Sequence, residues 1–234
     1  MKDISPCATC PKSGTAGFCS AVFDSKAPAG SIGTPDWQHH LVVPAGRQLL
    51  TANQTSPDVY IFCAGWGFRF LQMPDGRRQI VGFALPGDFL GMNMSGRHNF
   101  SADAIGAVTV CQFAKVPFGR FIEDRPHLLK RINELAVREL SQARDHMVLL
   151  GRRSADEKVA TFLLAWRERL LSFNEPSDTV PLPMSRQDIA DYLGLTIETV
   201  SRTFTKLERH GAIEIIHGGI SLIDAARVEA LAAA

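Results

Sequence analysis

The sequence predicts an α+β protein with an N-terminal antiparallel β-roll, a long helix and a C-terminal winged helix-turn-helix. Short β-type runs separated by turn residues extend from Trp37 to about Val116. Apolar residues then recur three and four positions apart from Leu129 to Leu150, and two capped helical segments follow Met184. These patterns set the expected boundaries: an irregular arm with three cysteines (1–30), the β-roll (31–123), the long helix (124–151) and the helix-turn-helix domain (152–234).

Composition and charge narrow the class of protein. The chain has 234 residues, of which 45% are hydrophobic and 21% charged, a balance that excludes a disordered or fibrous protein. Each apolar run is shorter than the about 18 residues needed to cross a bilayer, and no secretory signal is visible. We therefore expect a cytoplasmic protein with no membrane partner. Residues 152–234 hold ten Lys and Arg against twelve Asp and Glu. Any DNA contact there must come from locally placed side chains, because the domain is not basic overall.

The first half contains four clear strand patterns. They cover residues 58–62, 67–71, 79–84 and 107–113. Between the second and third patterns, Asp75-Gly76 is a strong signal for a tight hairpin turn. Short strands separated by turn signals in this way favour a closed antiparallel roll or barrel.

The long helix carries a narrow apolar stripe. Asp124 is expected to cap the helix and Pro126 to occupy its first turn, where the missing N–H costs nothing. The spacing of the stripe is that of a two-stranded coiled coil, and it suits equally well a helix packed on its own roll. The stripe, called the apolar seam below, consists of Leu129, Ile132, Ala136, Leu140, Ala143, Met147 and Leu150.

The C-terminal part has the plan of a helix-turn-helix. Ser185 can cap a first helix, with Asp188 three residues later in a capping-box arrangement. A tight turn at 194–196 leads to Thr196, which can cap a second helix that extends to about His210. Residues 212–222, folded back at Gly218-Gly219, would form the wing. In this plan the second helix is presented to a major groove.

Three residues near the start of that second helix suit base edges. Glu198, Ser201 and Arg202 share one face, at positions i, i+3 and i+4. Arg202 can donate two hydrogen bonds to guanine, Glu198 can accept one from cytosine, and Ser201 can serve either way. The alternative is an ordinary exposed Glu–Arg pair, and the cap-turn-cap context favours DNA binding.

These segments resemble a known family. Residues 188–202, DIADYLGLTIETVSR, closely resemble the DNA-reading segment of the Crp/Fnr superfamily, and the Glu-x-x-Ser-Arg form is similar to its Fnr/FixK branch. Residues 82–91, GFALPGDFLG, resemble the family's β-roll signature, so the resemblance covers nearly the whole chain. It implies a homodimer paired through the long helix, whose Glu198, Ser201 and Arg202 read TTGAT-type half-sites of palindromic double-stranded DNA. It also implies RNA polymerase as a partner, with the turn at 75–78 either its contact or, more simply, an exposed hairpin tip.

The β-roll does not carry the residues that the cyclic-AMP branch uses for its nucleotide. That branch has a Glu after the Gly-Asp-x-x-Gly turn and an Arg-Ser or Arg-Thr pair about ten residues later. Here Met92 follows the turn, and the expected place of the pair reads Phe100-Ser101-Ala102, with Arg97 out of register. Without a guanidinium to pair with a phosphate, no cyclic nucleotide is expected.

The cysteines point to a metal centre instead. Cys7, Cys10 and Cys19 lie in the arm as Cys-x2-Cys-x8-Cys, and four thiolates close together suit an iron–sulfur cluster or zinc. Fnr-type proteins hold an oxygen-labile [4Fe–4S] cluster through three N-terminal cysteines and one in a late strand of the roll. Cys111 matches that place, although the x8 gap is longer than the family's, so the resemblance implies Cys7, Cys10, Cys19 and Cys111 as ligands. Cys63 is expected to be a small buried hydrophobe. Zinc on the same ligands and an arm with incidental thiols are the alternatives.

The resemblance also implies a mechanism, in which an intact cluster favours pairing of the long helices and two recognition helices then lie one DNA turn apart. Arg144 stands where Fnr proteins often carry an interface aspartate. The alternatives within the family are a FixK-like regulator without a cluster and a haem-based nitric-oxide sensor. A cupin-type metalloenzyme is a different class, and its facial triad is missing, since His39 and His40 are adjacent and His98 stands alone.

Overall fold

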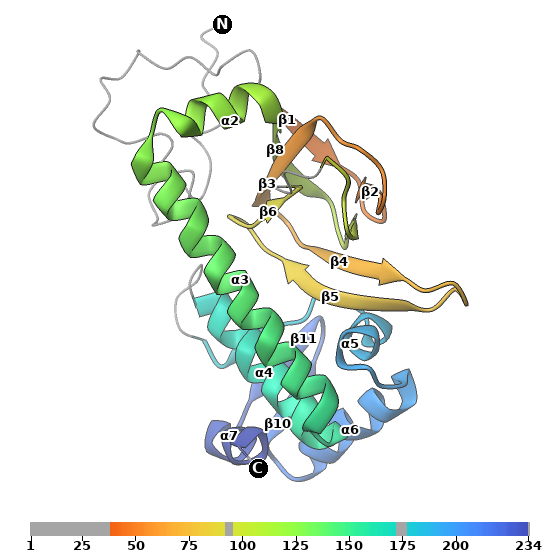
Figure 1. Ribbon diagram of the computed structural model, residues 1–234. Coiled ribbons are helices and arrows are strands. Elements are labelled where there is room, and N and C mark those ends of the chain that lie inside the picture. Colours follow the sequence, from red (N-terminus) through yellow and green to blue (C-terminus); the bar gives the residue numbers. More distant parts are fainter. Residues whose placement is uncertain (1–37, 92–95, 172–176, 234) are drawn as a thin grey trace, which may run out of the picture. The chain divides into compact units, whose positions relative to one another are not determined.

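The computed structural model describes residues 38–91, 96–171 and 177–233. The chain forms two compact units, Met1–Leu140 and Ser141–Ala234, and the boundary between them falls inside helix α3 (Pro126–Arg152). A β-roll, a long helix and a winged helix-turn-helix are all present (Figure 1), so the predicted fold class is confirmed.

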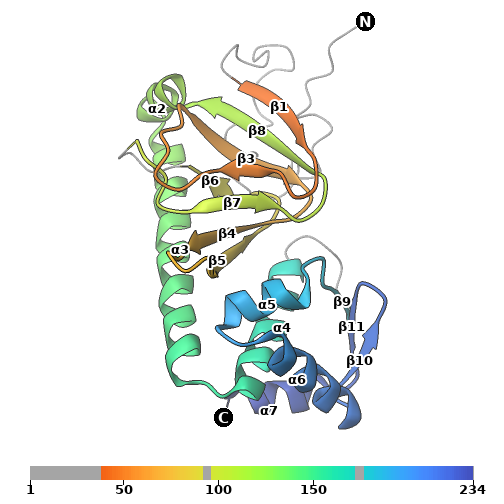
Figure 2. The ribbon, with the colours of Figure 1, turned by 90° about the vertical axis from the view of Figure 1, so that its right-hand side faces the viewer.

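The β-roll is built from short antiparallel strands. They are β1 (Gln38–Val43), β2 (Gln48–Leu50), β3 (Asp58–Ala64), β4 (Gly67–Gln72), β5 (Arg78–Ala84), β6 (Phe89–Leu90), β7 (Ser101–Ala104) and β8 (Val108–Ala114). Within the described residues they form two four-stranded sheets, ordered β1-β8-β3-β6 and β2-β7-β4-β5 (Figure 2). The four strands predicted from the sequence correspond to β3, β4, β5 and β8. Strands β2, β6 and β7 have four residues or fewer, too few for an alternating pattern to stand out.

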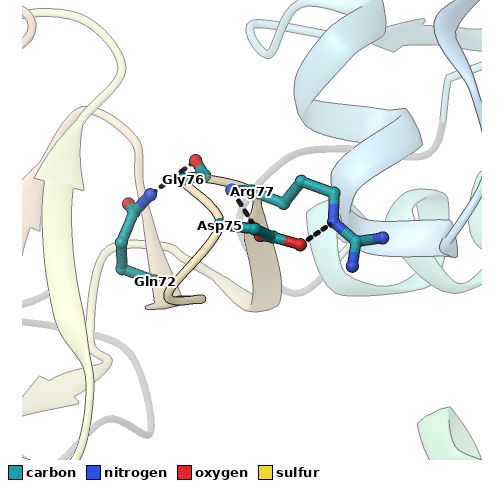
Figure 3. Close-up of polar contacts among 4 residues, drawn as sticks. All are labelled: Gln72, Asp75, Gly76 and Arg77. Atoms are coloured by element: carbon teal, nitrogen blue, oxygen red, sulfur yellow. Dashed lines mark hydrogen bonds and ion pairs between the residues drawn. The ribbon is translucent and has the colours of Figure 1, made fainter.

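The β4–β5 hairpin closes through the predicted Asp-Gly turn (Figure 3). Gly76 has a left-handed φ of 86°, and its N–H donates to the carbonyl of Met73 at 3.0 Å. The carboxylate of Asp75 accepts from the backbone N–H and the Nε of Arg77 at 3.0 and 2.8 Å, and Gln72 Nε2 donates to the carbonyl of Gly76 at 2.6 Å. The turn therefore satisfies its own polar groups, as an exposed hairpin tip must.

Sheet β1-β8-β3-β6 has a separate apolar cluster on each face, because successive side chains of a strand point to opposite sides. The inner cluster lies between the two sheets, and the outer cluster lies between this sheet, helix α2 (Lys115–Glu123) and the first turns of α3. The inner cluster contains Leu50, Phe62, Ala84, Leu90, Ala102, Ala104, Val108 and Val110. The outer cluster contains Val59, Ile61, Cys63, Cys111, Phe113, Phe118, Ile122 and Leu128.

Helix α3 begins at Pro126, as predicted, but the prediction that Asp124 caps it is wrong. Asp124 is the C-cap of α2, and Arg125 connects the two helices, with its Nη1 donating to the carbonyl of Phe121 at 2.9 Å. Helix α2 was not anticipated, since it contains a proline and a glycine (KVPFGRFIE), both unfavourable in helix interiors.

Helix α3 packs on the roll with one face and leaves most of the apolar seam uncovered. Leu128 is buried in the outer cluster, and Ile132 packs partly buried against it. Leu129, Leu140 and Met147 are 57%, 51% and 62% exposed. The helix therefore packs on its own roll, and pairing of its exposed seam with a second helix stays a prediction.

The second unit is a winged helix-turn-helix. Its elements after α3 are α4 (Ala155–Leu171), β9 (Thr179–Pro181), α5 (Arg186–Leu193), α6 (Ile197–Arg209), β10 (Ile213–Ile216), β11 (Gly219–Leu222) and α7 (Ala225–Ala233). The wing is a three-stranded sheet ordered β10-β11-β9, of which the sequence predicted two strands. Trp166 of α4 joins this sheet to the helices, since its Nε1 donates to the carbonyl of Pro181 at 2.8 Å. In the described part of the chain, no helix is both long and apolar enough to cross a membrane.

Candidate functional site

The turn between α5 and α6 is fixed by side-chain caps at both helix starts. Ser185 Oγ accepts from the N–H of Asp188 at 3.1 Å, and the Asp188 carboxylate accepts from the N–H of Ser185 at 2.8 Å. Helix α5 ends at Gly194 in the left-handed region, with a φ of 61°. Thr196 Oγ1 then accepts from the N–H of Thr199 at 3.2 Å and begins α6. The predicted capping box, turn glycine and second cap are all confirmed.

The structure brings Glu198, Ser201 and Arg202 together on one exposed face of α6. The pKa of Glu198 is lowered because its own backbone N–H and the Thr196 hydroxyl donate hydrogen bonds to its carboxylate, and because Arg202 is near. Glu198 is therefore an ionised acceptor. The exposed face offers an acceptor, a hydroxyl and a guanidinium, which together match the donors and acceptors of base edges.

The opposite face of α6 anchors it in the domain. Val200, Phe204 and Leu207 are buried there, and the guanidinium of Arg186 from α5 lies over the Phe204 ring at 3.4 Å from its centroid. Lys206 forms an ion pair with Asp156 of α4. With its apolar side packed, α6 can present only its polar side to a partner.

Within the wing, β11 packs tightly against β9. A Cβ at Gly219 would lie 2.4 Å from the carbonyl oxygen of Val180, closer than any side chain can come. Gly218 at the tip has a left-handed φ of 75°. The backbone of Ile215 is tied to α6, because its N–H donates to the Glu208 carboxylate at 2.9 Å. This hydrogen bond joins the wing to the C-terminal part of α6.

In the first unit, Cys111 lies on β8 in the outer cluster and is 2% exposed. Its Sγ is 2.9 Å from the Sγ of Cys63, which is 5% exposed, and 3.3 Å from Nε2 of His40. We call His40, Cys63 and Cys111 the thiol–imidazole group. The sequence predicted Cys63 to be buried, which it is, but nothing in its spacing indicated contact with Cys111. The sequence pattern assigns His40 no ligand role, because it is one of two adjacent histidines that lack the spacing of a metal triad.

The other three predicted cluster ligands, Cys7, Cys10 and Cys19, lie outside the described residues. The described part of the chain begins with β1, which pairs along β8, and His40 stands directly opposite Cys111 in the register.

The place where a nucleotide-binding roll would carry its Arg-Ser pair is filled by contacts within the protein. Ser101 is buried, and its Oγ accepts from the N–H of Ala52 at 3.0 Å. The guanidinium of Arg69 lies 5.5 Å from the centroid of the Phe100 ring and forms an ion pair with Glu139 of α3. Met92 lies outside the described residues. That this roll binds no cyclic nucleotide stays a prediction.

Three further histidines, His39, His98 and His217, divide between the surface and the core. His39 on β1 and His217 in the wing turn are exposed, as expected. His98 is only 2% exposed, contrary to the expectation of a solvent or turn position, and its burial lowers its pKa.

Comparisons with known proteins match both units. The family model described as a cyclic nucleotide-binding domain matches residues 40–125, and that described as a Crp-like helix-turn-helix domain matches residues 157–231. The nitrogen fixation regulation protein FixK of Bradyrhizobium diazoefficiens is 90% identical over 190 residues, covering 81% of this chain and 80% of FixK. The chain belongs to the FixK branch of the Crp/Fnr family.

Two further matches agree with this assignment. This Crp/Fnr regulator is 53% identical to the transcriptional activatory protein AadR of Rhodopseudomonas palustris over 211 residues, 88% of each chain. The solved structure of FixK2 from Bradyrhizobium japonicum has a TM-score of 0.78 and 33% identity, covering 84% of this chain and 98% of that chain. The chain is therefore a DNA-binding transcription regulator and not an enzyme, so the cupin-type alternative is wrong.

Proposed function

We propose that this FixK-type regulator is an oxygen-responsive activator of anaerobic or microaerobic genes. In this proposal Cys7, Cys10, Cys19 and Cys111 hold a [4Fe–4S] cluster, and the homodimer binds TTGAT-type palindromes and engages RNA polymerase. The observation that carries the proposal is the location of Cys111 in the same packed cluster as the first turns of α3. A change at this thiol would act directly on the helix that carries the apolar seam.

The described residues around Cys111 are compatible with a thiolate-bound cluster. Cys111 projects from a central strand into the outer cluster, an apolar setting of the kind that tunes iron–sulfur centres. In sequence the arm precedes β1, which pairs with the strand that carries Cys111. The cluster would supply the reactivity toward oxygen, and the chain would supply the four thiolates and the packing around them.

The packing continues from Cys111 to helix α3. Cys111 and Leu128 belong to the same buried cluster, and Ile132 and Leu135 of α3 pack against it. Ile132 is also a member of the apolar seam. A displacement of β8 therefore changes the support of α3 on the side that adjoins its open face, and packed interiors transmit such shifts rather than absorbing them.

The open face of α3 supports pairing with a second copy. Leu129, Leu140 and Met147 are more than half exposed, and burying such side chains is favourable by about 25 cal/mol per Å² of apolar surface. Ala136 and Ala143, also exposed, allow two helices to approach closely. Arg144 is exposed in the same part of α3. It would place a positive charge near the helix–helix interface, at a position where the family often has an aspartate.

On DNA, each α6 would enter a major groove with Glu198, Ser201 and Arg202 at the base edges. Arg202 would donate to the guanine of TTGAT, and the ionised Glu198 would accept from a cytosine amino group. Two half-sites one turn apart match the twofold symmetry of a dimer.

The test is an anaerobic purification of the full-length protein, with measurement of iron, sulfide and visible absorption, followed by a DNA-binding assay before and after exposure to air. The proposal expects about four irons per chain, a broad band that air bleaches, and loss of binding to a TTGAT palindrome along with the band. Cys19→Ala should lose the iron, and Cys63→Ala, a matched removal of a thiol outside the ligand set, should retain it. A colourless protein that binds the palindrome equally in air contradicts the proposal.

A FixK-like regulator without a cluster is the second candidate. It is favoured by the 90% identity to FixK and by the contact between Cys111 and Cys63, which gives the Cys111 thiol a neighbour within the roll. In that case Cys10→Ala and Cys19→Ala leave DNA binding unchanged with and without oxygen, whereas a cluster-dependent regulator loses it in both variants.

A further inference from the structure

We propose that His40, Cys63 and Cys111 form a site for a thiophilic divalent metal ion of the zinc class. In the described part of the chain, the ligand atoms of these three residues all lie within 4.8 Å of one another. The arm cysteines are not part of this site, so the proposal goes beyond the oxygen-sensing function and does not depend on it.

The sheet brings the three side chains to one face. His40 of β1 and Ile61 of β3 both stand directly opposite Cys111 of β8, and residues that are opposite in an antiparallel sheet point to the same side. Cys63 is two residues beyond Ile61, on the same face. The β3–β8 ladder skips Cys63, since Phe62 pairs with Val110 and Ala64 pairs with Thr109. Such a bulge re-aims a side chain, and here its sulfur comes next to that of Cys111.

The distances suit a tetrahedral ion after a small adjustment. With bonds of about 2.3 Å to sulfur and about 2.0 Å to nitrogen, tetrahedral ligands lie about 3.5 Å apart for N and S and about 3.8 Å for two sulfurs. His40 Nε2 is 3.3 Å from Cys111 Sγ, and the two Sγ atoms are 2.9 Å apart. The two sulfurs must therefore separate by less than about 1 Å, which a rotation of the Cys63 side chain can supply.

The charges also balance. Two thiolates and a neutral imidazole exactly offset a divalent ion, so the complex has no net charge among the apolar side chains of the outer cluster. A thiolate at 2% exposure loses most of its hydration, so its charge is costly to bury without a compensating positive charge. A bound divalent ion removes that cost for both sulfurs at once.

The donor set selects the metal class. Sulfur and imidazole ligands favour zinc and its spectroscopic substitute Co²⁺ over Mg²⁺ or Ca²⁺, which take oxygen ligands. Three protein ligands leave a fourth position open. Of the three ligands, His40 is partly exposed and the two cysteines are buried.

Cys111 is common to this site and to the proposed cluster, so the two centres would compete for one thiolate. The zinc-class ion would occupy the roll when the arm thiols are not engaged with Cys111. Binding of the ion can be measured without the cluster, by removing the arm thiols and leaving the roll intact.

The test uses the full-length protein with Cys7, Cys10 and Cys19 all replaced by serine, titrated anaerobically with Co²⁺ and then with Zn²⁺. The expected result is one Co²⁺ per chain, with a sulfur-to-cobalt charge-transfer band in the near ultraviolet and intense tetrahedral bands in the visible, all abolished by Zn²⁺. In the same background, His40→Ala should weaken Co²⁺ binding by at least about tenfold. Cys63→Ala should reduce the charge-transfer band. His39→Ala, an exposed neighbour on the same strand, is the matched control and should change nothing.

Circular dichroism and a cooperative urea denaturation curve verify that each variant is folded. Absence of the cobalt bands in the folded arm-thiol variant overturns the proposal, as does binding that His40→Ala and Cys63→Ala leave unchanged. Loss of two mass units through a Cys63–Cys111 disulfide under these anaerobic conditions also overturns it. Failure of the wild-type protein to hold iron contradicts the oxygen-sensing function alone and leaves the cobalt result standing.

Discussion

Replacing Arg202 by alanine tests whether α6 reads bases or only holds the DNA backbone. The Arg202 side chain is exposed in the first turns of α6, beside Glu198 and Ser201, and does not contribute to the buried side of the helix. The change should therefore alter the free energy of unfolding by less than about 0.5 kcal/mol. Any effect on DNA binding then reports on the contact itself.

The magnitude follows from the contact that the exposed guanidinium can make. A bidentate Arg–guanine pair discriminates against a wrong base by about 1–3 kcal/mol, which is about 5- to 150-fold in Kd for each half-site. Arg202→Ala should lose this factor on a TTGAT palindrome and lose little on a palindrome whose guanines are replaced. Fluorescence anisotropy at one fixed salt concentration, on both palindromes and on random DNA, measures the three affinities.

Arg209→Ala is the matched control, because it removes the same charge from an exposed position at the far end of the same helix. It should weaken binding to all three DNAs by a similar small factor. Equal loss on all three DNAs in Arg202→Ala would refute the reasoning and make Arg202 a phosphate contact, whose removal lowers affinity regardless of sequence.

Three further outcomes are expected. Thr196→Ala removes the cap of α6 and should lower the free energy of unfolding by about 1 kcal/mol in urea denaturation, and an unchanged midpoint would contradict the capping role. Leu140→Glu, at a position 51% exposed in a single chain, should leave the fold intact but shift the protein from dimer to monomer in sedimentation, whereas a stable dimer would rule out the apolar seam as the interface. Burial lowers the pKa of His146 in the folded protein, so the unfolded state binds the proton more readily. The free energy of unfolding should therefore be highest above pH 6.5, the ordinary pKa of histidine, and should fall as the pH drops below that value. Urea denaturation at pH 7.5 and 5.5 measures this loss, which His146→Leu should reduce.

The geometry of the helix-turn-helix could be predicted from the sequence almost residue by residue. Its signals are local: a serine and an aspartate three residues apart, a glycine at the helix end and a threonine before the next helix. Each acts within one turn of the chain, so the residue types alone determine the geometry. The exposed positions of Glu198, Ser201 and Arg202 then follow from the period of the helix.

The surroundings of Cys111 could not be predicted in this way. Cys63 comes next to it through a bulge, and His40 through the register of a strand pair 71 residues apart in sequence. Register and bulges depend on long-range packing, which a single sequence does not display. The same limitation explains Asp124, which can cap a helix on local grounds and instead ends the preceding one.

The sheet β1-β8-β3-β6 separates two chemically distinct environments by the thickness of one layer. Side chains that face the inner cluster and side chains that face the outer cluster share few neighbours, so substitutions on the two faces should be nearly additive in their effect on stability. Repacking the interior between the sheets is then thermodynamically independent of the thiols on the other side.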